Sequence, residues 1–108
     1  MKRYSVHVIS DAEDDLFDIY KYAARHDGPD RAEKLLLKLE EYCNSLSDLP
    51  ERGHIPPEME RIGIMTYREI HFKPYRIIYQ IISKNVYIHC VVDGRRDMTD
   101  FLQRRLLR

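Results

Sequence analysis

The spacing of apolar residues between Asp30 and Leu46 constrains the fold more than any other feature of the sequence. These residues recur at intervals of three and four, which places them on one face of a helix. They are Ala32, Leu35, Leu36, Leu39, Tyr42, Cys43 and Leu46. The stretch opens with Asp30 and has Glu33 three residues later, as expected at the start of a helix.

A second helical pattern precedes this one and ends near Gly28-Pro29. The segment Ser10-Asp11-Ala12-Glu13 matches a capping box, which predicts Ser10 as the N-cap and Glu13 at the third helical position. Its acidic first turn suits the helix dipole. The apolar face of this helix consists of Leu16, Ile19, Tyr20 and Ala23. Two helices joined by so short a turn should form an antiparallel hairpin.

The rest of the chain is rich in β-branched and aromatic residues, which favour strands. The predicted strands are Tyr4–Ile9, Ile64–Phe72, Tyr75–Ile82 and Val86–Val92. Prolines and a glycine make Leu49–Pro57 a predicted loop, and Asp97–Leu107 is a predicted closing helix. The predicted fold is α+β in the order β-α-α-β-β-β-α, with the helical hairpin on one face of a small, mainly antiparallel sheet, in a single domain of residues 1–108.

Charge is unevenly distributed along a chain whose net charge is zero. Residues 1–60 hold 8 Lys/Arg and 14 Asp/Glu, a net charge of −6, and residues 61–108 hold 10 and 4, a net charge of +6. The acidic half suits a basic partner, and the basic half suits an anionic target or an acidic protein. Cys43 and Cys90 fall at apolar positions of periodic segments, so we expect reduced core thiols and a cytoplasmic protein. The sequence has no apolar run of membrane-spanning length and no signal peptide, and predicts no membrane partner.

Short turns would set the register of the predicted strands. A two-residue loop at Lys84-Asn85 places Ile77 opposite Val92 and Tyr79 opposite Cys90, on the face that packs against the hairpin. The opposite face then carries the polar residues and is left open. These polar residues are Arg76 opposite Asp93, Gln80 opposite His89, and His71 beside Arg76 with Glu69 and Tyr67.

A cluster of Glu, His and Arg side chains on an open sheet could cleave RNA. A carboxylate or imidazole would take the proton of the 2′-hydroxyl, and arginines would stabilise the charge of the phosphorane-like transition state. The alternative is an ordinary outward polar face, in which Arg76 pairs with Asp93 and the histidines are solvated. The residues alone leave both interpretations open.

Two adjacent arginines follow the last predicted strand, in the segment Asp93-Gly94-Arg95-Arg96-Asp97. Gly94 can adopt an unusual backbone angle, which would present Arg95 and Arg96 at the rim of the sheet. Such a rim could bind phosphate or carboxylate groups. Alternatively, Arg95 or Arg96 pairs with a neighbouring aspartate.

The spacing of the other polar residues indicates neither a metal site nor a cofactor site. His7 and His26 are isolated, His54 lies in the proline-rich loop, and no set of His, Cys or acidic residues has a recognised metal spacing. The sequence also has no glycine-rich phosphate loop and no nucleophile elbow. We therefore expect no metal site and no cofactor.

Several segments together resemble the RelE/ParE superfamily of bacterial toxins, and the ParE branch most closely. The resemblance rests on the order and spacing of the segments and covers essentially the whole chain. They are Ala12-Glu13-Asp14-Asp15-Leu16, Leu49-Pro50-Glu51-Arg52-Gly53, Tyr67-Arg68-Glu69-Ile70, Tyr75-Arg76-Ile77-Ile78-Tyr79, Val91-Val92-Asp93-Gly94-Arg95-Arg96-Asp97 and the closing Leu102–Arg105.

The resemblance to the ParE branch implies a plasmid-stabilisation toxin of a type II toxin–antitoxin system. In that branch the usual target is DNA gyrase, and the toxin is an inhibitor, so no catalytic residues are expected. The resemblance then implies a target-binding surface in the rim and the closing helix. Its expected members are Arg95, Arg96, Phe101, Arg104 and Arg105.

The RelE branch implies a different activity, that of a ribosome-dependent mRNA endonuclease. If the chain were a nuclease, the residues involved would be His71, Arg76, His89 and Arg96. Two departures count against this activity: Leu102 stands where that branch has a tyrosine, and Arg68, Glu69 and Ile70 replace its lysines. A third alternative is a relative that binds antitoxin but is not toxic.

The resemblance also implies a ParD-like antitoxin and a hetero-oligomer formed with it. Antitoxins of this kind wrap a disordered segment over the helices and the sheet edge of the toxin. We expect apolar antitoxin residues to fill a groove beside the hairpin and acidic ones to meet the arginines. The expected antitoxin-binding residues are Leu16, Ile19, Tyr20, Leu35, Leu39, Arg95 and Arg96.

Overall fold

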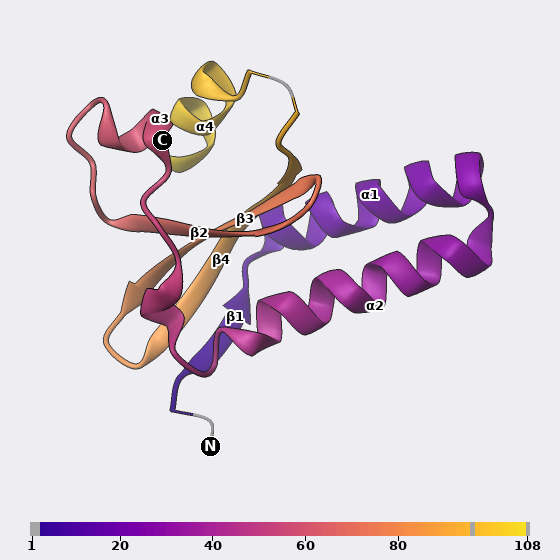
Figure 1. The fold of residues 1–108 in the computed structure, drawn as a ribbon, viewed down its shortest axis with the longest axis horizontal. Helices are drawn as coiled ribbons and strands as arrows, with labels where there is room; N and C mark the ends of the chain where they lie inside the picture. The colour runs from indigo at the N-terminus through magenta and orange to yellow at the C-terminus, as the bar shows by residue number, and fades with distance from the viewer. Residues whose placement is uncertain (1–2, 96, 108) are drawn as a thin grey trace.

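The computed structural model describes residues 3–95 and 97–107, and these form an α+β fold with the predicted order of elements (Figure 1). The elements are β1 (Ser5–Val8), α1 (Ser10–Asp27), α2 (Pro29–Ser45), the 3₁₀ helix η1 (Pro50–Arg52), α3 (Pro57–Glu60), β2 (Tyr67–Phe72), β3 (Tyr75–Ile82), β4 (Asn85–Asp93) and α4 (Thr99–Leu106). The predicted loop Leu49–Pro57 therefore contains η1 and leads into α3. Each of these short helices has a proline at its start, where a missing N–H costs nothing. None of the described helices is both long enough and apolar enough to span a bilayer.

The sheet has the strand order β1-β4-β3-β2 and is mainly antiparallel. β2 pairs with β3 and β3 with β4 in antiparallel fashion, whereas β1 runs parallel to β4. The two helices of the hairpin connect β1 to the rest of the sheet, as a parallel pairing requires a long crossover.

Strand β1 leads directly into α1, and this corrects the predicted N-cap. The Ile9 N–H donates to the Ile88 carbonyl, and the Ile9 carbonyl accepts the first helical hydrogen bond from the Glu13 N–H. Ile9 is therefore the N-cap, and Ser10 is the first helical residue. The start of α1 is therefore set by the point at which β1 stops pairing with β4, and not by the capping-box pattern.

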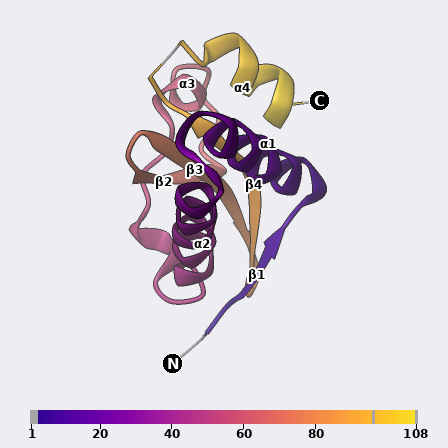
Figure 2. The same ribbon diagram turned by 90° about the vertical axis from the view of Figure 1, so that its right-hand side faces the viewer.

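The hairpin turns at Gly28, whose φ of 94° is one that residues with a side chain rarely adopt. Pro29 is the first residue of α2, one position before the predicted start. α1 and α2 run side by side and project beyond the sheet (Figures 1 and 2). Their inner faces and one face of the sheet form a continuous core of Ala12, Leu16, Leu39, Cys43, Leu46, Ile77, Tyr79, Val86, Ile88 and Val91.

The second face of the sheet is also covered, which corrects the expectation of an open face. α3 and α4 lie together over it, on the side away from the hairpin (Figure 1). Leu102 and Leu106 are four residues apart on α4, so both point at the sheet. They belong to a second apolar cluster with Met59, Tyr67, Ile78, Cys90, Val92 and Met98.

The register between β3 and β4 differs from the predicted one for two reasons. The turn falls at Ser83-Lys84, with Ser83 at a φ of 58°, so Ile82 pairs with Asn85. A bulge then shifts the pairing, from Tyr79 opposite Ile88 to Ile78 opposite Cys90. The predicted Ile77–Val92 and Tyr79–Cys90 pairs are therefore wrong, and Cys90 and Val92 face α4 instead of the hairpin.

The register between β2 and β3 is the predicted one. A two-residue turn at Lys73-Pro74 sets Phe72 opposite Tyr75 and His71 opposite Arg76. Glu69 lies on the same face as His71 because alternate residues of a strand point the same way. The predicted meeting of Glu69, His71 and Arg76 is confirmed.

Candidate functional site

Arg76 lies at the centre of a buried ion-pair network on the second face of the sheet. Its Nε and Nη2 donate to the two carboxylate oxygens of Glu69, at 2.6 and 3.0 Å. Its Nη1 and Nη2 donate to the carboxylate of Glu58, at 2.7 and 2.8 Å. The Glu69 side chain is 1% exposed and those of Arg76 and Glu58 11% and 12%, so these charges are nearly dehydrated. The predicted Arg76–Asp93 ion pair is wrong, because Arg76 lies opposite Val92.

The ion pair between Arg76 and Glu58 shifts the pKa of both groups. Hydrogen bonding from Arg76 lowers the pKa of Glu58, and the two carboxylates, Glu58 first, raise the pKa of Arg76. Four hydrogen bonds to carboxylates occupy most of the five N–H donors of a guanidinium. The Arg76 guanidinium therefore uses most of its N–H donors inside the protein, and these donors do not point toward a ligand.

Two histidines flank the buried Glu69 carboxylate on its solvent side. His71 Nε2 lies 3.1 Å from Glu69 Oε1, and His54 Nε2 lies 3.3 Å from Glu69 Oε2. His54 reaches this place because residues 54 and 69 form an antiparallel backbone bridge. The sequence pattern shows Glu69 and His71 on one face, but His54 was missed because the loop that carries it has no strand pattern.

His89 lies apart from His71 on the same face. Its Nε2 is 3.2 Å from Gln80 Oε1, and its ring packs edge-on against Tyr67, with centroids 5.4 Å apart. Tyr67 and His71 are four residues apart on β2, which is about 13 Å along a strand. Burial, and secondarily Arg105, lower the pKa of His89. The structure therefore does not bring the two histidines to one reaction centre.

The rim beyond β4 is exposed and carries Arg95. Its guanidinium pairs with Asp93 at 2.6 Å, and its side chain is 75% exposed. This is the pairing with a neighbouring aspartate that the sequence left open. Arg96, expected in the target surface, the antitoxin surface and the possible nuclease site, lies outside the described residues.

The arginines of α4 have different environments. Arg104 is exposed, whereas Arg105 is 14% exposed and turned toward α1. Arg105 Nη2 donates to Asp15 at 2.5 Å and to the Asp11 carbonyl at 3.0 Å. Its guanidinium also lies 5.3 Å from the ring centre of the half-buried Phe101. Arg105 thus fastens α4 to α1.

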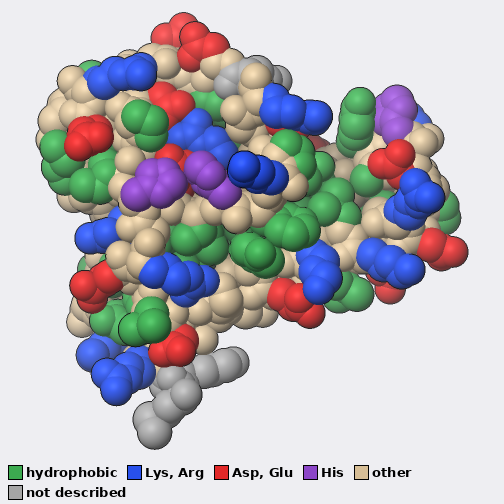
Figure 3. Space-filling model, viewed as in Figure 1, with side chains coloured by type: hydrophobic (Ala, Val, Ile, Leu, Met, Phe, Trp, Pro, Cys, Tyr) green, Lys and Arg blue, Asp and Glu red, His purple; other side chains and the backbone are tan. Residues whose placement is uncertain are grey.

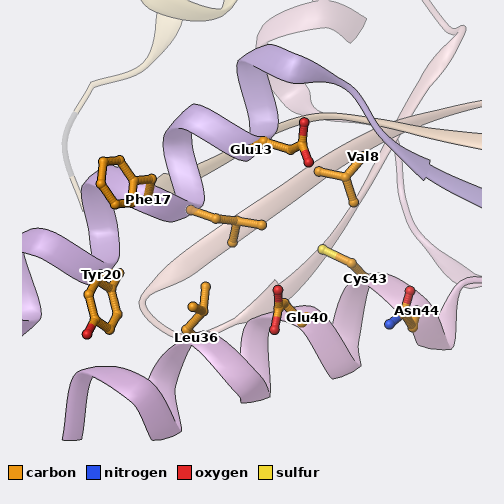
Figure 4. A pocket seen from close by; sticks show the side chains of 9 residues that line it. Val8, Glu13, Phe17, Tyr20, Leu36, Glu40, Cys43 and Asn44 are labelled. Atoms are coloured by element: carbon orange, nitrogen blue, oxygen red, sulfur yellow. The ribbon is translucent and has the colours of Figure 1, made fainter. Parts of the chain in front are cut away.

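A groove of about 640 Å³ opens between α1 and α2. Phe17 and Tyr20 of α1 line it together with Leu36 and Glu40 of α2, and Figure 4 shows Tyr20 on the side of α1 toward α2. Of the expected antitoxin-binding residues, Leu16 and Tyr20 line this groove, and Ile19 and Leu35 are partly buried against the core. Leu39 is fully buried in the core.

A second groove, of about 660 Å³, lies between α1, the sheet and α4. It brings together residues that the sequence assigned to target binding and to antitoxin binding. Arg95, Phe101 and Arg105 line it beside Ile19, and Tyr22 and Tyr75 complete the wall. The rim and the hairpin are therefore neighbouring parts of one surface.

Comparisons with known proteins agree with this architecture. Residues 7–98 match the family described as the ParE toxin of the type II toxin–antitoxin system parDE. No curated protein matches the chain.

Two solved structures are similar in fold. A chain of the chromosomal ParDE toxin–antitoxin system from P. aeruginosa has a TM-score of 0.72 and 19% identity, over 86% of this chain and 98% of that one. A chain of the RelBE2 toxin–antitoxin complex from Mycobacterium tuberculosis has a TM-score of 0.63 and 24% identity, over 86% and 93%. At these sequence identities, the similarity to the two structures shows only that the fold is shared. The family assignment rests on the match over residues 7–98. The chain belongs to the ParE toxin family of type II toxin–antitoxin systems.

Proposed function

We propose that this type II toxin acts by binding and inhibiting DNA gyrase, and that a ParD-like antitoxin neutralises it. The observation that carries the proposal is the enclosure of Arg76 by Glu58 and Glu69. Among the described residues, Arg76 is the arginine that a nuclease of the RelE branch would use. An arginine that is already paired with two carboxylates has little capacity to stabilise the charge of a phosphorane.

The surroundings of Arg76 also argue against RNA cleavage. The apolar cluster beneath α3 and α4 fills the sheet face beside it. His71 and His89 lie too far apart to act on one phosphate, because general acid–base catalysis needs each group within hydrogen-bond reach of the reacting atoms. These features support a binding toxin.

The proposed target surface is the exposed rim and the outer side of α4. Arg95 and Arg104 are its exposed cations, and Phe101 adds an apolar edge beside the second groove. Arg96 adjoins Arg95 in the sequence and belongs to the proposal on that ground. We leave Arg105 out, because its guanidinium is held by Asp15.

The proposed antitoxin surface is the groove between α1 and α2 together with the rim. The groove exposes apolar side chains that a folding peptide segment could cover, and arginines at the rim would attract its acidic residues. The two structural neighbours described above come from toxin–antitoxin systems, which supports a hetero-oligomer of toxin and antitoxin. Affinity for the cognate antitoxin, measured at low salt with Arg95 and Arg96 changed to Glu, tests the rim contact; an unchanged dissociation constant would exclude it.

The target is tested by expressing the chain without its antitoxin and following DNA and protein synthesis separately in the first minutes. We expect DNA synthesis to fall first, and the purified protein to inhibit supercoiling by gyrase. The variant with Arg95→Glu and Arg104→Glu should lose this inhibition, while Arg31→Glu with Lys34→Glu, an equal charge change on the exposed side of α2, should keep it. Early arrest of protein synthesis with cleaved mRNA would establish the nuclease alternative, and growth without any arrest would establish a non-toxic relative.

A further inference from the structure

The cluster of His54, Glu69 and His71 has the composition and spacing of a metal site. We propose that these three residues bind a divalent transition-metal ion of the zinc class, with water in the fourth position. The ligand set is two imidazole nitrogens and one carboxylate oxygen, a combination that zinc sites with an open position use. The site is independent of the toxin activity proposed above.

The distances between the ligand atoms suit such an ion. The two Nε2 atoms lie 3.1 and 3.3 Å from the Glu69 oxygens, and the three ligand atoms all fall within 4.8 Å of one another. Tetrahedral coordination at Zn–N and Zn–O distances of 2.0–2.1 Å separates neighbouring ligand atoms by about 3.3 Å. An ion can therefore enter with only small rotations of the two imidazole rings.

Backbone contacts hold all three residues in place. Glu69 and His71 are alternate residues of β2, and His54 is tied to Glu69 by two backbone hydrogen bonds of 3.1 and 2.7 Å. Gly53 lies so close to β2 that an added Cβ would sit 2.7 Å from the Glu69 carbonyl and in collision with the Tyr79 hydroxyl. The site is thus built on fixed elements, as tight metal binding requires.

Arg76 and Glu58 supply the surroundings that a metal-binding carboxylate needs. Arg76 orients both oxygens of Glu69, and Glu58 offsets the charge of Arg76. Carboxylates that bind a metal ion are commonly held in place by hydrogen bonds from neighbouring groups. The formal charges of Glu58, Glu69 and Arg76 sum to −1, a sign that attracts a cation.

The ion would have free access from solvent. His54 and His71 are 61% and 41% exposed, and their rings meet edge to face with centroids 5.1 Å apart. Figure 3 shows two histidine side chains gathered side by side on the surface of this face. Bound metal would fasten residues 54 and 71 together and so tie the segment around η1 to the sheet.

The test uses the full chain without a histidine tag, stripped with EDTA and titrated with Zn²⁺ by calorimetry. We expect binding of one ion per chain and a rise in the thermal unfolding midpoint with added Zn²⁺. Co²⁺ in place of Zn²⁺ should give the visible absorption bands of a low-symmetry nitrogen–oxygen site. His54→Ala and His71→Ala should each weaken binding by at least about tenfold, and together abolish it.

Both variants change exposed side chains, so they should fold, which circular dichroism will show. His26→Ala, which removes an exposed histidine from α1, is the matched control and should bind Zn²⁺ like the unchanged chain. Absence of 1:1 binding in the unchanged chain would overturn the proposal. So would a site of equal affinity in the folded double variant, which would show that Zn²⁺ binds elsewhere. In either case Glu69 merely accepts hydrogen bonds from the two imidazoles.

Discussion

Gly94 lies directly against the aliphatic part of Arg76: a Cβ added to Gly94 would sit 2.6 Å from Arg76 Cδ and 2.7 Å from Cγ. The Gly94 N–H also donates to the Pro74 carbonyl at 2.9 Å. A side chain at position 94 would therefore push against Arg76, the residue that pairs with Glu58 and Glu69.

The contact makes Gly94→Ala a destabilising change. We expect a loss of about 1–3 kcal/mol in the free energy of unfolding, because Arg76 is held by two carboxylates and cannot move aside at low cost. Urea denaturation followed by circular dichroism measures this. Arg95→Ala, at the exposed neighbouring position, is the control; equal stability of the two variants would contradict the contact.

Removal of Arg76 should have a larger effect on stability. Arg76→Met leaves Glu58 and the 1%-exposed Glu69 without a countercharge, and we expect a loss of about 3–5 kcal/mol. Arg76→Lys should also lose most of this stability, because an ammonium group cannot pair with two carboxylates in the fork-like geometry of a guanidinium. The measurement is again urea denaturation.

A compensated variant separates the charge effect from the loss of packing. Adding Glu58→Gln and Glu69→Gln to Arg76→Met removes the stranded charges, so this triple variant should be more stable than Arg76→Met alone. If the triple variant proves no more stable, the cost lies in packing and not in unpaired charge.

The groove between α1 and α2 gives a direct test of antitoxin binding. Phe17 lines it and is 58% exposed, so Phe17→Asp should leave the fold intact. Affinity for the cognate antitoxin should fall by more than about tenfold, since an apolar anchor is replaced by a charge. Leu37→Asp is the matched control, because Leu37 is 53% exposed on α2 and lies outside the lining of the groove. Equal affinities of the two variants would place the antitoxin elsewhere.

The lowered pKa of His89 predicts acid sensitivity. Burial disfavours the imidazolium in the folded state, so below about pH 6.5 the unfolded chain takes up a proton that the folded chain resists. The contribution of His89 to stability is therefore present above that pH and is lost as the pH falls through the folded pKa. His89→Gln should reduce the loss of stability between pH 7 and pH 5 in denaturant titrations. An unchanged pH dependence in His89→Gln would show that other groups cause it.

Both cysteines should be chemically inert in the folded protein. Burial raises the pKa of Cys43 and of Cys90 to about 12, so their thiols stay protonated at pH 8–9. Because the thiolate is the reactive form, alkylation by iodoacetamide should proceed only as fast as the protein opens. Mass spectrometry with and without denaturant measures this, and rapid labelling of either native thiol would show that its site is open to solvent.

Local patterns determined the elements of this protein. The apolar spacing from Ala32 to Leu46 required a helix with one buried face, and the Gly28-Pro29 pair required a break before it. These follow from the sequence because helix periodicity, glycine φ angles and the missing proline N–H act within a few residues. The pairing of His71 with Arg76 followed equally from a two-residue turn.

Tertiary contacts decided the site. The bulge opposite Ile78 and Tyr79 turned Cys90 and Val92 toward α4, and the docking of α3 placed Glu58 on Arg76 in place of the predicted Asp93. The backbone bridge to Glu69 brought in His54 from a loop with no strand pattern. The contact of Glu58 with Arg76 joins residues 18 positions apart and the bridge of His54 to Glu69 joins residues 15 apart, and their geometry depends on how whole elements pack. The sequence thus determined the main helices and strands and which family the chain resembles, whereas only the packed structure decided which charges neutralise each other and which groups remain for a ligand.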